Sequence, residues 1–168
     1  MDSIENPVTG QKVTFLMQTE DVLVTEWVVQ SGRPSDPVHI HPNQEERVQV
    51  VAGRIRRNLG SGRSDQLGQG GEWVIPAGTR HTWENATAEP IRLRIEFRPA
   101  LRTAEFMTRI YGLAAAGKTN ARGVPNPLQV AVLATQYAPE IQITSPPPAV
   151  QRVAFAILAP IARRLGYR

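Results

Sequence analysis

The segment from Ile91 to Arg98 alternates apolar and charged side chains without exception, reading Ile-Arg-Leu-Arg-Ile-Glu-Phe-Arg. Because successive side chains of a β-strand point to opposite faces, this pattern predicts a strand with one buried face and one solvent face. Shorter apolar or alternating runs precede it, at residues 22–29, 46–51, 54–59 and 72–75. Polar or glycine-containing turns such as residues 60–65 separate them. Short strands joined by turns predict an antiparallel sandwich or barrel over residues 13–98.

The pattern changes after Pro99, where apolar residues recur at helical spacing. Thr103 can cap a first helix, in which one apolar stripe is made of Phe106, Met107, Ile110, Tyr111 and Ala114. Asn126 followed by Pro127 is typical of an N-cap with proline at the first helical position, and it predicts a second helix.

Ser145 followed by Pro146 repeats this signal and is expected to open the most regular helix of the chain. Its apolar face is made of Val150, Val153, Ala154, Ile157, Leu158, Ile161, Ala162 and Leu165. Pro160 is expected to kink it, and the long apolar face indicates a helix that packs on protein. We therefore expect a mainly β chain, with a barrel at residues 1–100. About three α-helices should follow at residues 101–168, packing on the barrel or on a partner subunit.

Composition limits the chemistry that this chain can perform. It has no cysteine and three histidines, so any metal site must use imidazole and carboxylate groups. The first residues carry acids and a proline where a signal peptide has basic and then apolar residues, which favours a cytoplasmic protein. The longest strongly apolar stretch, residues 153–162, is too short to span a membrane.

The formal net charge of +4 comes from the helical region, because residues 101–168 hold eight basic and two acidic residues. Of the 19 basic residues in the chain, 17 are arginine, and they are scattered rather than clustered. This distribution favours a solvated or subunit-facing surface, so we expect no nucleic-acid partner. Contact of the basic tail with a membrane surface is the less favoured alternative. The abundance of apolar helical surface predicts a homodimer or larger assembly.

Two segments carry candidate metal ligands. In the first, His39 and His41 are two residues apart, so on a strand both point to one face and can converge on one ion. A proline ends that strand, and the next strand can return a carboxylate to the same ion. In the second segment, the turn at residues 76–78 delivers His81 to the start of a new strand. The sequence therefore predicts a site built from imidazoles and a carboxylate.

The two segments together match the paired motifs of a known family. Residues 32–53 contain a glycine, the pattern HxH, a glutamate and a second glycine, and residues 70–85 contain a glycine, PxG, a histidine and an asparagine. In these spacings the chain resembles the cupin superfamily (cupin type-2 conserved barrel), and its flanking stretches resemble a bacterial single-domain subgroup with a helical C-terminus. The resemblance implies a double-stranded β-helix, the cupin jelly roll, that holds one divalent ion. It implies as ligands His39, His41, Glu46 and His81.

Glu45 competes with Glu46 for the carboxylate position, because the family pattern tolerates either distance from the second histidine. Glu46 shares its strand face with Val48 and Val50, whereas Glu45 shares the other face with an arginine and a glutamine, which suit solvent. We therefore prefer Glu46 and keep Glu45 as the alternative.

Residues beside the last histidine are candidates for a substrate pocket. Trp83 should share the inward face with His81, where it could either stack on a substrate or fill the end of the barrel. Asn85 should face the same way and is expected to be structural. Arg80 could meet an anionic substrate at the barrel mouth, or it could be an exposed arginine of the turn. Trp83 and Arg80 are thus the pocket candidates.

Three neutral nitrogens and one carboxylate suit one divalent transition metal ion, such as Fe, Mn, Ni, Co or Zn. Four protein ligands leave up to two positions of an octahedral ion open, which favours a metal-dependent dioxygenase acting on a small oxygen-rich molecule such as an enol, catechol or diketone. A Lewis-acid isomerase or decarboxylase is the alternative chemistry. A non-catalytic metal or small-molecule binding or sensor module is the alternative class. No separate acid or base is identifiable, since every histidine is already used.

Overall fold

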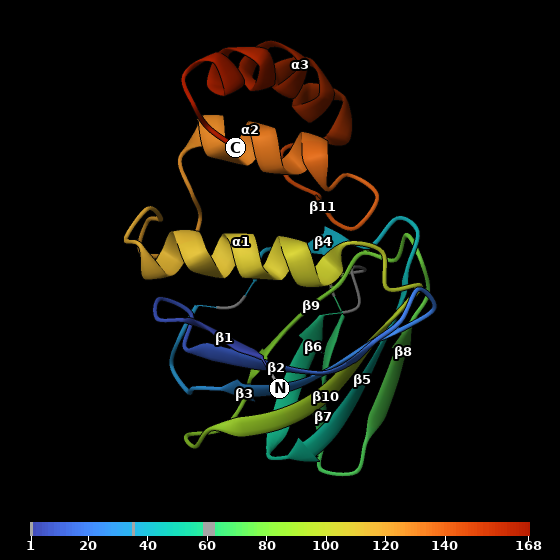
Figure 1. Ribbon diagram of the computed structural model, residues 1–168. Coiled ribbons are helices and arrows are strands. Elements are labelled where there is room, and N and C mark those ends of the chain that lie inside the picture. Colours follow the sequence, from blue (N-terminus) through green and yellow to red (C-terminus); the bar gives the residue numbers. More distant parts are fainter. Residues whose placement is uncertain (1, 35, 59–62) are drawn as a thin grey trace.

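The computed structural model describes residues 2–34, 36–58 and 63–168. Figure 1 shows a barrel of short strands followed along the chain by three helices that lie at one end of the barrel. The described residues up to position 100 form ten strands: β1 Ser3–Asn6, β2 Gln11–Gln18, β3 Leu23–Val29, β4 His39–Ile40, β5 Glu45–Ala52, β6 Arg54–Asn58, β7 Ser64–Gly68, β8 Glu72–Ile75, β9 Thr82–Asn85 and β10 Ile91–Arg98. The prediction of a mainly β barrel followed by about three helices is confirmed.

Nine of these ten strands form two antiparallel sheets with a shared core, and β4 instead pairs with a short strand of the helical region. The larger sheet has the order β1-β2-β3-β10-β5-β8, and the smaller has the order β7-β6-β9. The alternating pattern of strand β10 matches the burial of its residues: the apolar ones are at most 3% exposed, while the arginines point outward. Trp27 of β3 and Trp83 of β9 meet edge to face, with ring centroids 5.9 Å apart, which joins the two sheets.

Most predicted strands lie within one residue of their observed bounds. The predicted end of the 54–59 strand and most of the predicted 60–65 turn fall outside the described residues. Ser64 and Asp65 belong to β7 rather than to a turn. This strand escaped prediction because it is largely polar, and an ion pair between Asp65 and Arg57 of β6 helps to hold it at the sheet edge.

Gly53, between β5 and β6, has a backbone geometry that only glycine tolerates. Its φ is +85°, and a Cβ atom there would lie 2.4 Å from Cγ2 of Ile91. The last glycine of the first motif therefore permits the tight passage of the chain from one sheet to the other.

The region after residue 100 contains α1 Thr103–Ala115, α2 Pro127–Gln136, β11 Gln142–Ile143 and α3 Pro148–Arg164. Helix α1 lies across the barrel and places Met107 and Tyr111 in the barrel core (Figure 1). Helices α2 and α3 pack on each other farther from the barrel. Asn126 caps α2 as predicted, since its Oδ1 accepts hydrogen bonds from the backbone N–H groups of Leu128 and Gln129 at 3.0 and 3.1 Å.

Two predicted helix caps are wrong. Thr103 is the first residue of α1, its hydroxyl bonds to Gln44, and it makes no cap. Helix α3 begins at Pro148 rather than after Ser145. Residues 145–147 each precede a proline, and the residue before a proline is biased away from the helical conformation, so the helix starts only at the last proline of the run.

The predicted apolar face of α3 is divided in the structure. Ala159 and Ala162 are buried, and the helix continues through Pro160 to Arg164. Leu158 is half-buried. The other five large side chains of the face are 44–65% exposed, and they are Val150, Val153, Ile157, Ile161 and Leu165. We call these five residues the α3 stripe. No helix of the described residues is long and apolar enough to cross a membrane.

Candidate metal centre

Backbone hydrogen bonds bring the two predicted segments together. His39 lies on β4 and forms an isolated antiparallel β-bridge with His81. The N–H of His39 donates to the carbonyl of His81 at 3.1 Å, and the N–H of His81 donates to the carbonyl of His39 at 3.0 Å. Gly78, with φ of +75°, donates its N–H to the carbonyl of His41 at 2.8 Å. The turn at residues 76–78 therefore sets the second segment against the first, as its glycine and proline predicted.

The four predicted ligands lie together inside the protein. His39, His41, Glu46 and His81 are at most 8% exposed, and each offers one donor atom within 4.8 Å of the others. Glu46 Oε2 is 2.9 Å from His81 Nε2 and 3.2 Å from His41 Nε2. Ligands held at about 2.1 Å from one ion lie up to roughly 4.2 Å apart, so the cluster is close to the spacing that a transition metal needs. We call these four residues the donor cluster.

Each imidazole of the donor cluster is held by a backbone carbonyl through its other nitrogen. Nδ1 of His39 bonds Pro37 O at 2.8 Å, that of His41 bonds Glu140 O at 2.7 Å, and that of His81 bonds Thr79 O at 2.9 Å. A carbonyl oxygen only accepts, so each Nδ1 carries the proton. In the neutral rings every Nε2 then presents a lone pair toward the centre, which is the arrangement that orients metal-binding histidines.

This arrangement needs positive charge at the centre. Lone pairs on Nε2 of His41 and His81 would otherwise face the carboxylate of Glu46 at hydrogen-bonding distance. Burial and the neighbouring imidazoles lower the pKa of His39 to about 3, so this ring is neutral and ready to bind a cation. A divalent ion between these atoms satisfies the three nitrogens and the carboxylate together. The residues present therefore fit a metal ion.

Protons on the imidazoles can supply the same positive charge that a cation would supply. Burial by itself would raise the pKa of Glu46, but the hydrogen bonds with His41 and His81 outweigh it and hold the pKa well below its usual range. Burial lowers the pKa of His81, yet its hydrogen bond to Glu46 prevails and raises it above the ordinary value. The cluster thus binds either protons or a cation.

The choice between the two glutamates agrees with the structure. Glu46 is 3% exposed and shares its buried face with Val48 and Val50. Glu45 points outward and accepts a hydrogen bond from Arg47 at 2.6 Å. Strand parity therefore identified the carboxylate that joins the cluster.

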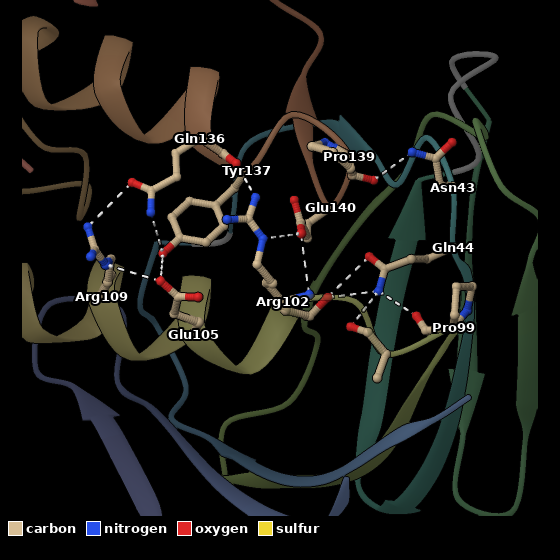
Figure 2. A network of polar contacts seen from close by, with 12 residues as sticks. Asn43, Gln44, Pro99, Arg102, Glu105, Arg109, Gln136, Tyr137, Pro139 and Glu140 are labelled. Carbon is tan, nitrogen blue, oxygen red and sulfur yellow. Dashed lines mark hydrogen bonds and ion pairs between the residues drawn. The ribbon is translucent and has the colours of Figure 1, made fainter. Parts of the chain in front are cut away.

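Residues of the helical region also position the site, and sequence reasoning missed them. Strand β11 pairs with β4, and the carbonyl of Glu140 just before it holds His41. Figure 2 shows the side chain of Glu140 bonded to Arg102, and Asn43 donating to the carbonyl of Pro139 at 3.2 Å. Backbone carbonyls have no signature in a sequence, so nothing in the chain pointed to these contacts.

Three members of the donor cluster, His39, His41 and Glu46, line a cavity of about 970 Å³ that extends to the helices. Trp83 lines this cavity and also packs in the core against Trp27. Arg80 is exposed, lies outside the cavity lining, and bonds Thr144 at 3.3 Å. The amide of Asn85 bonds backbone carbonyls on neighbouring segments, which is the structural role expected of it.

Asp36 is a carboxyl group of the cavity lining outside the donor cluster, and nothing in the sequence indicated that it could act as an acid or base. Its Oδ2 accepts a hydrogen bond from Gln11 Nε2 at 3.1 Å, and Tyr111 donates to Gln11 Oε1 at 2.7 Å. Burial raises the pKa of Asp36, the Gln11 hydrogen bond offsets part of this rise, and the charge of Glu46 adds to it. A carboxyl group beside a substrate can act as a general acid or base. Its position in a loop before Pro37 resembled an ordinary turn aspartate.

Comparisons with known proteins agree with this geometry. The sequence profile of the cupin domain matches residues 25–96. An RmlC-like cupin from Shewanella frigidimarina is 22% identical, with a TM-score of 0.53 over 60% of this chain and 86% of its own. KdgF from a Halomonas species is 20% identical, with a TM-score of 0.53 over 62% of this chain and 93% of its own. At these identities the similarity shows a shared fold, the double-stranded β-helix. No curated protein matches the sequence.

Proposed function

Since the chain contains a cupin domain at residues 25–96 with a buried cluster of three histidines and one glutamate, we propose that it is a metal-dependent enzyme. We propose a dioxygenase acting on an oxygen-rich organic molecule such as an enol, catechol or diketone. The hydrogen bonds of the three Nδ1 atoms carry this proposal, because they fix every Nε2 lone pair on one point. A merely structural cluster of histidines would not need all three rings aligned in this way.

The bound ion would supply activation of dioxygen or polarisation of a substrate oxygen. The chain contributes the rest. His39, His41 and His81 would hold the ion, and Glu46 would reduce the charge of the site from +2 to about +1. The donor cluster is buried, and Trp83 supplies an aromatic wall in the cavity beside it.

Asp36 favours a second candidate chemistry, isomerisation or decarboxylation with the ion as a Lewis acid. Its carboxyl group lines the same cavity as the donor cluster and has a raised pKa. It could take a proton from a substrate carbon next to a polarised carbonyl and return it elsewhere. A dioxygenase has less need of such a group, so Asp36 separates the two chemistries.

A matched pair of glutamate variants tests metal binding. Protein purified without added metal should contain close to one transition metal ion per chain by elemental analysis. Glu46→Gln should lose most of this metal because it removes the only carboxylate of the cluster, while Glu45→Gln should keep it. Equal metal content in both variants would contradict the assignment.

Oxygen consumption then distinguishes the chemistries. Uptake of dioxygen with an enol, catechol or diketone that needs Glu46 and tolerates Asp36→Asn supports the dioxygenase. Turnover without oxygen uptake that is lost in Asp36→Asn supports the Lewis-acid enzyme. Metal retention without turnover of any tested compound supports a non-catalytic binding or sensor module.

A further inference from the structure

The cavity beside the donor cluster is larger and more apolar than a small oxygen-rich molecule requires. Its volume of about 970 Å³ lies at the upper end of the roughly 300–1,000 Å³ that is common for ligand pockets. It begins at the donor cluster and continues between α1, α2 and α3. The helical part of its wall includes Phe106, Ile110, Val130, Leu133, Ala134 and Phe155.

The packing of the three helices leaves these apolar side chains lining the cavity. Helix α1 packs on the barrel, and α2 packs mainly on α3. A polar network links the first half of α1 to the end of α2 (Figure 2), in which Tyr137 donates to Glu105 at 2.6 Å and Arg102 bonds Glu140 and the carbonyl of Gln136. This network holds α1 and the pair of α2 and α3 together at one edge of the space between them. Apolar walls facing water are unfavourable, so the space between them suits an apolar occupant.

The end of the cavity near the donor cluster is polar, and one polar atom there has no hydrogen-bond partner among the described residues. Glu140 is 3% exposed and lines the cavity, and its Oε2 atom is buried without a hydrogen-bond partner among the described residues. A buried carboxylate oxygen without a partner is costly. A ligand with an O–H or N–H group beside its metal-binding oxygen would satisfy this atom.

The helical part of the lining is basic. Arg122, Arg152 and Arg163 are exposed residues of the lining, and their guanidinium groups make no hydrogen bond or ion pair with the described part of the chain. These free cations favour a ligand that is neutral or anionic over one that is cationic.

We propose that the cavity binds an amphipathic substrate, with an oxygen-bearing head group at the donor cluster and an elongated apolar body between α1, α2 and α3. The head group donates a hydrogen bond to Glu140. This assignment rests on the proposed function for the head group and names its substrate class. The apolar body is recognised by the helices and needs no metal.

Alkyl hydroxamic acids test both ends of this ligand, because their head group binds metals and carries an N–H donor. With metal-loaded protein, calorimetry should show that dodecanohydroxamate binds on the order of 100-fold more tightly than acetohydroxamate. Ala134→Trp, which fills the space between the helices, should abolish this gain and leave acetohydroxamate binding unchanged. Ala115→Trp, at an exposed position of α1 outside the lining, is the matched control and should keep the gain. Ile110→Trp on the opposite wall replaces Ala134→Trp if that variant does not fold.

Metal-free protein separates this inference from the metal centre. The fluorescent chain 11-(dansylamino)undecanoate should bind the EDTA-treated protein, be displaced by dodecanoate, and fail to bind the Ala134→Trp variant. Binding of acetohydroxamate without any gain from chain length would overturn the inference and leave the metal centre intact. If the purified protein contains no metal and takes up none when metal is added, binding of the dansyl chain would still support the apolar site, while the failure to hold metal would refute the metal centre. A chain-length gain that survives in both tryptophan variants of the lining would place the chain elsewhere and overturn the inference.

Discussion

Replacing Gln44 by leucine should destabilise the protein and loosen the metal centre together. Gln44 is 1% exposed and precedes the strand that carries Glu46. Its Nε2 lies 2.7 Å from Pro99 O, 3.0 Å from Ala100 O and 2.8 Å from Thr103 Oγ1, so it ties that strand to the start of α1 (Figure 2). Leucine has a similar size and no donor. The amide NH2 has two hydrogens to share among these three acceptors, so losing two hydrogen bonds of about 1 kcal/mol each and leaving buried carbonyls unpaired should cost roughly 3 kcal/mol.

For a chain of this length that cost corresponds to a fall in the midpoint of thermal unfolding of roughly 6–12 °C. Gln49→Leu is the matched control, because Gln49 lies on the same strand, is exposed, and bonds only Glu72 at 3.3 Å. Its effect on stability should stay within about 0.5 kcal/mol. Calorimetry on both metal-free variants measures the difference, and metal titration should show affinity reduced about 10–100-fold in Gln44→Leu alone. Equal unfolding midpoints for the two variants would refute the role assigned to Gln44.

Two further predictions concern protons and assembly. Metal must displace protons from the donor cluster. Burial lowers the pKa of His81, but the hydrogen bond to Glu46 has the larger effect and the net shift is upward. Metal affinity should therefore be highest above this raised pKa and should fall as the pH drops through it. A titration that gives the same metal affinity at pH 8 and pH 5 would contradict this. We also propose that the α3 stripe is covered by a second copy of the chain, because its side chains are 44–65% exposed. Light scattering should then give a dimer mass that Ile157→Asp reduces to that of a monomer, and a monomeric parent protein at micromolar concentration would refute it.

The strands could be predicted because their pattern reports burial directly. Apolar and charged residues alternate from Ile91 to Arg98, and in the sheet the apolar ones are buried and the arginines are exposed. The same alternation of strand faces placed Glu46 inside and Glu45 outside. Spacing predicted that His39 and His41 converge and that a glycine turn delivers His81, while the resemblance to cupins implied the full ligand set.

The helices were predicted less well, because their limits and contacts depend on features that act over longer distances. A run of prolines moved the start of α3 to Pro148, and Thr103 bonds Gln44 in the core instead of capping. Periodicity identified the apolar face of α3 but could not say what it packs against. Of that face only Ala162 is fully buried within the chain.

The same limit applies to the function of the helical region, which helps to build the site. His41 and Glu140 are separated by 99 positions in the sequence, yet the carbonyl of Glu140 fixes the proton of His41 on Nδ1 and so turns Nε2 toward the centre. Its side chain meanwhile has one buried oxygen without a hydrogen-bond partner among the described residues. One residue thus connects the orientation of a metal ligand with the proposed recognition of a substrate. A ligand that occupies the space between the helices and bonds Glu140 would therefore order His41 as well, so binding of the apolar chain and binding of the metal should strengthen each other to the same extent.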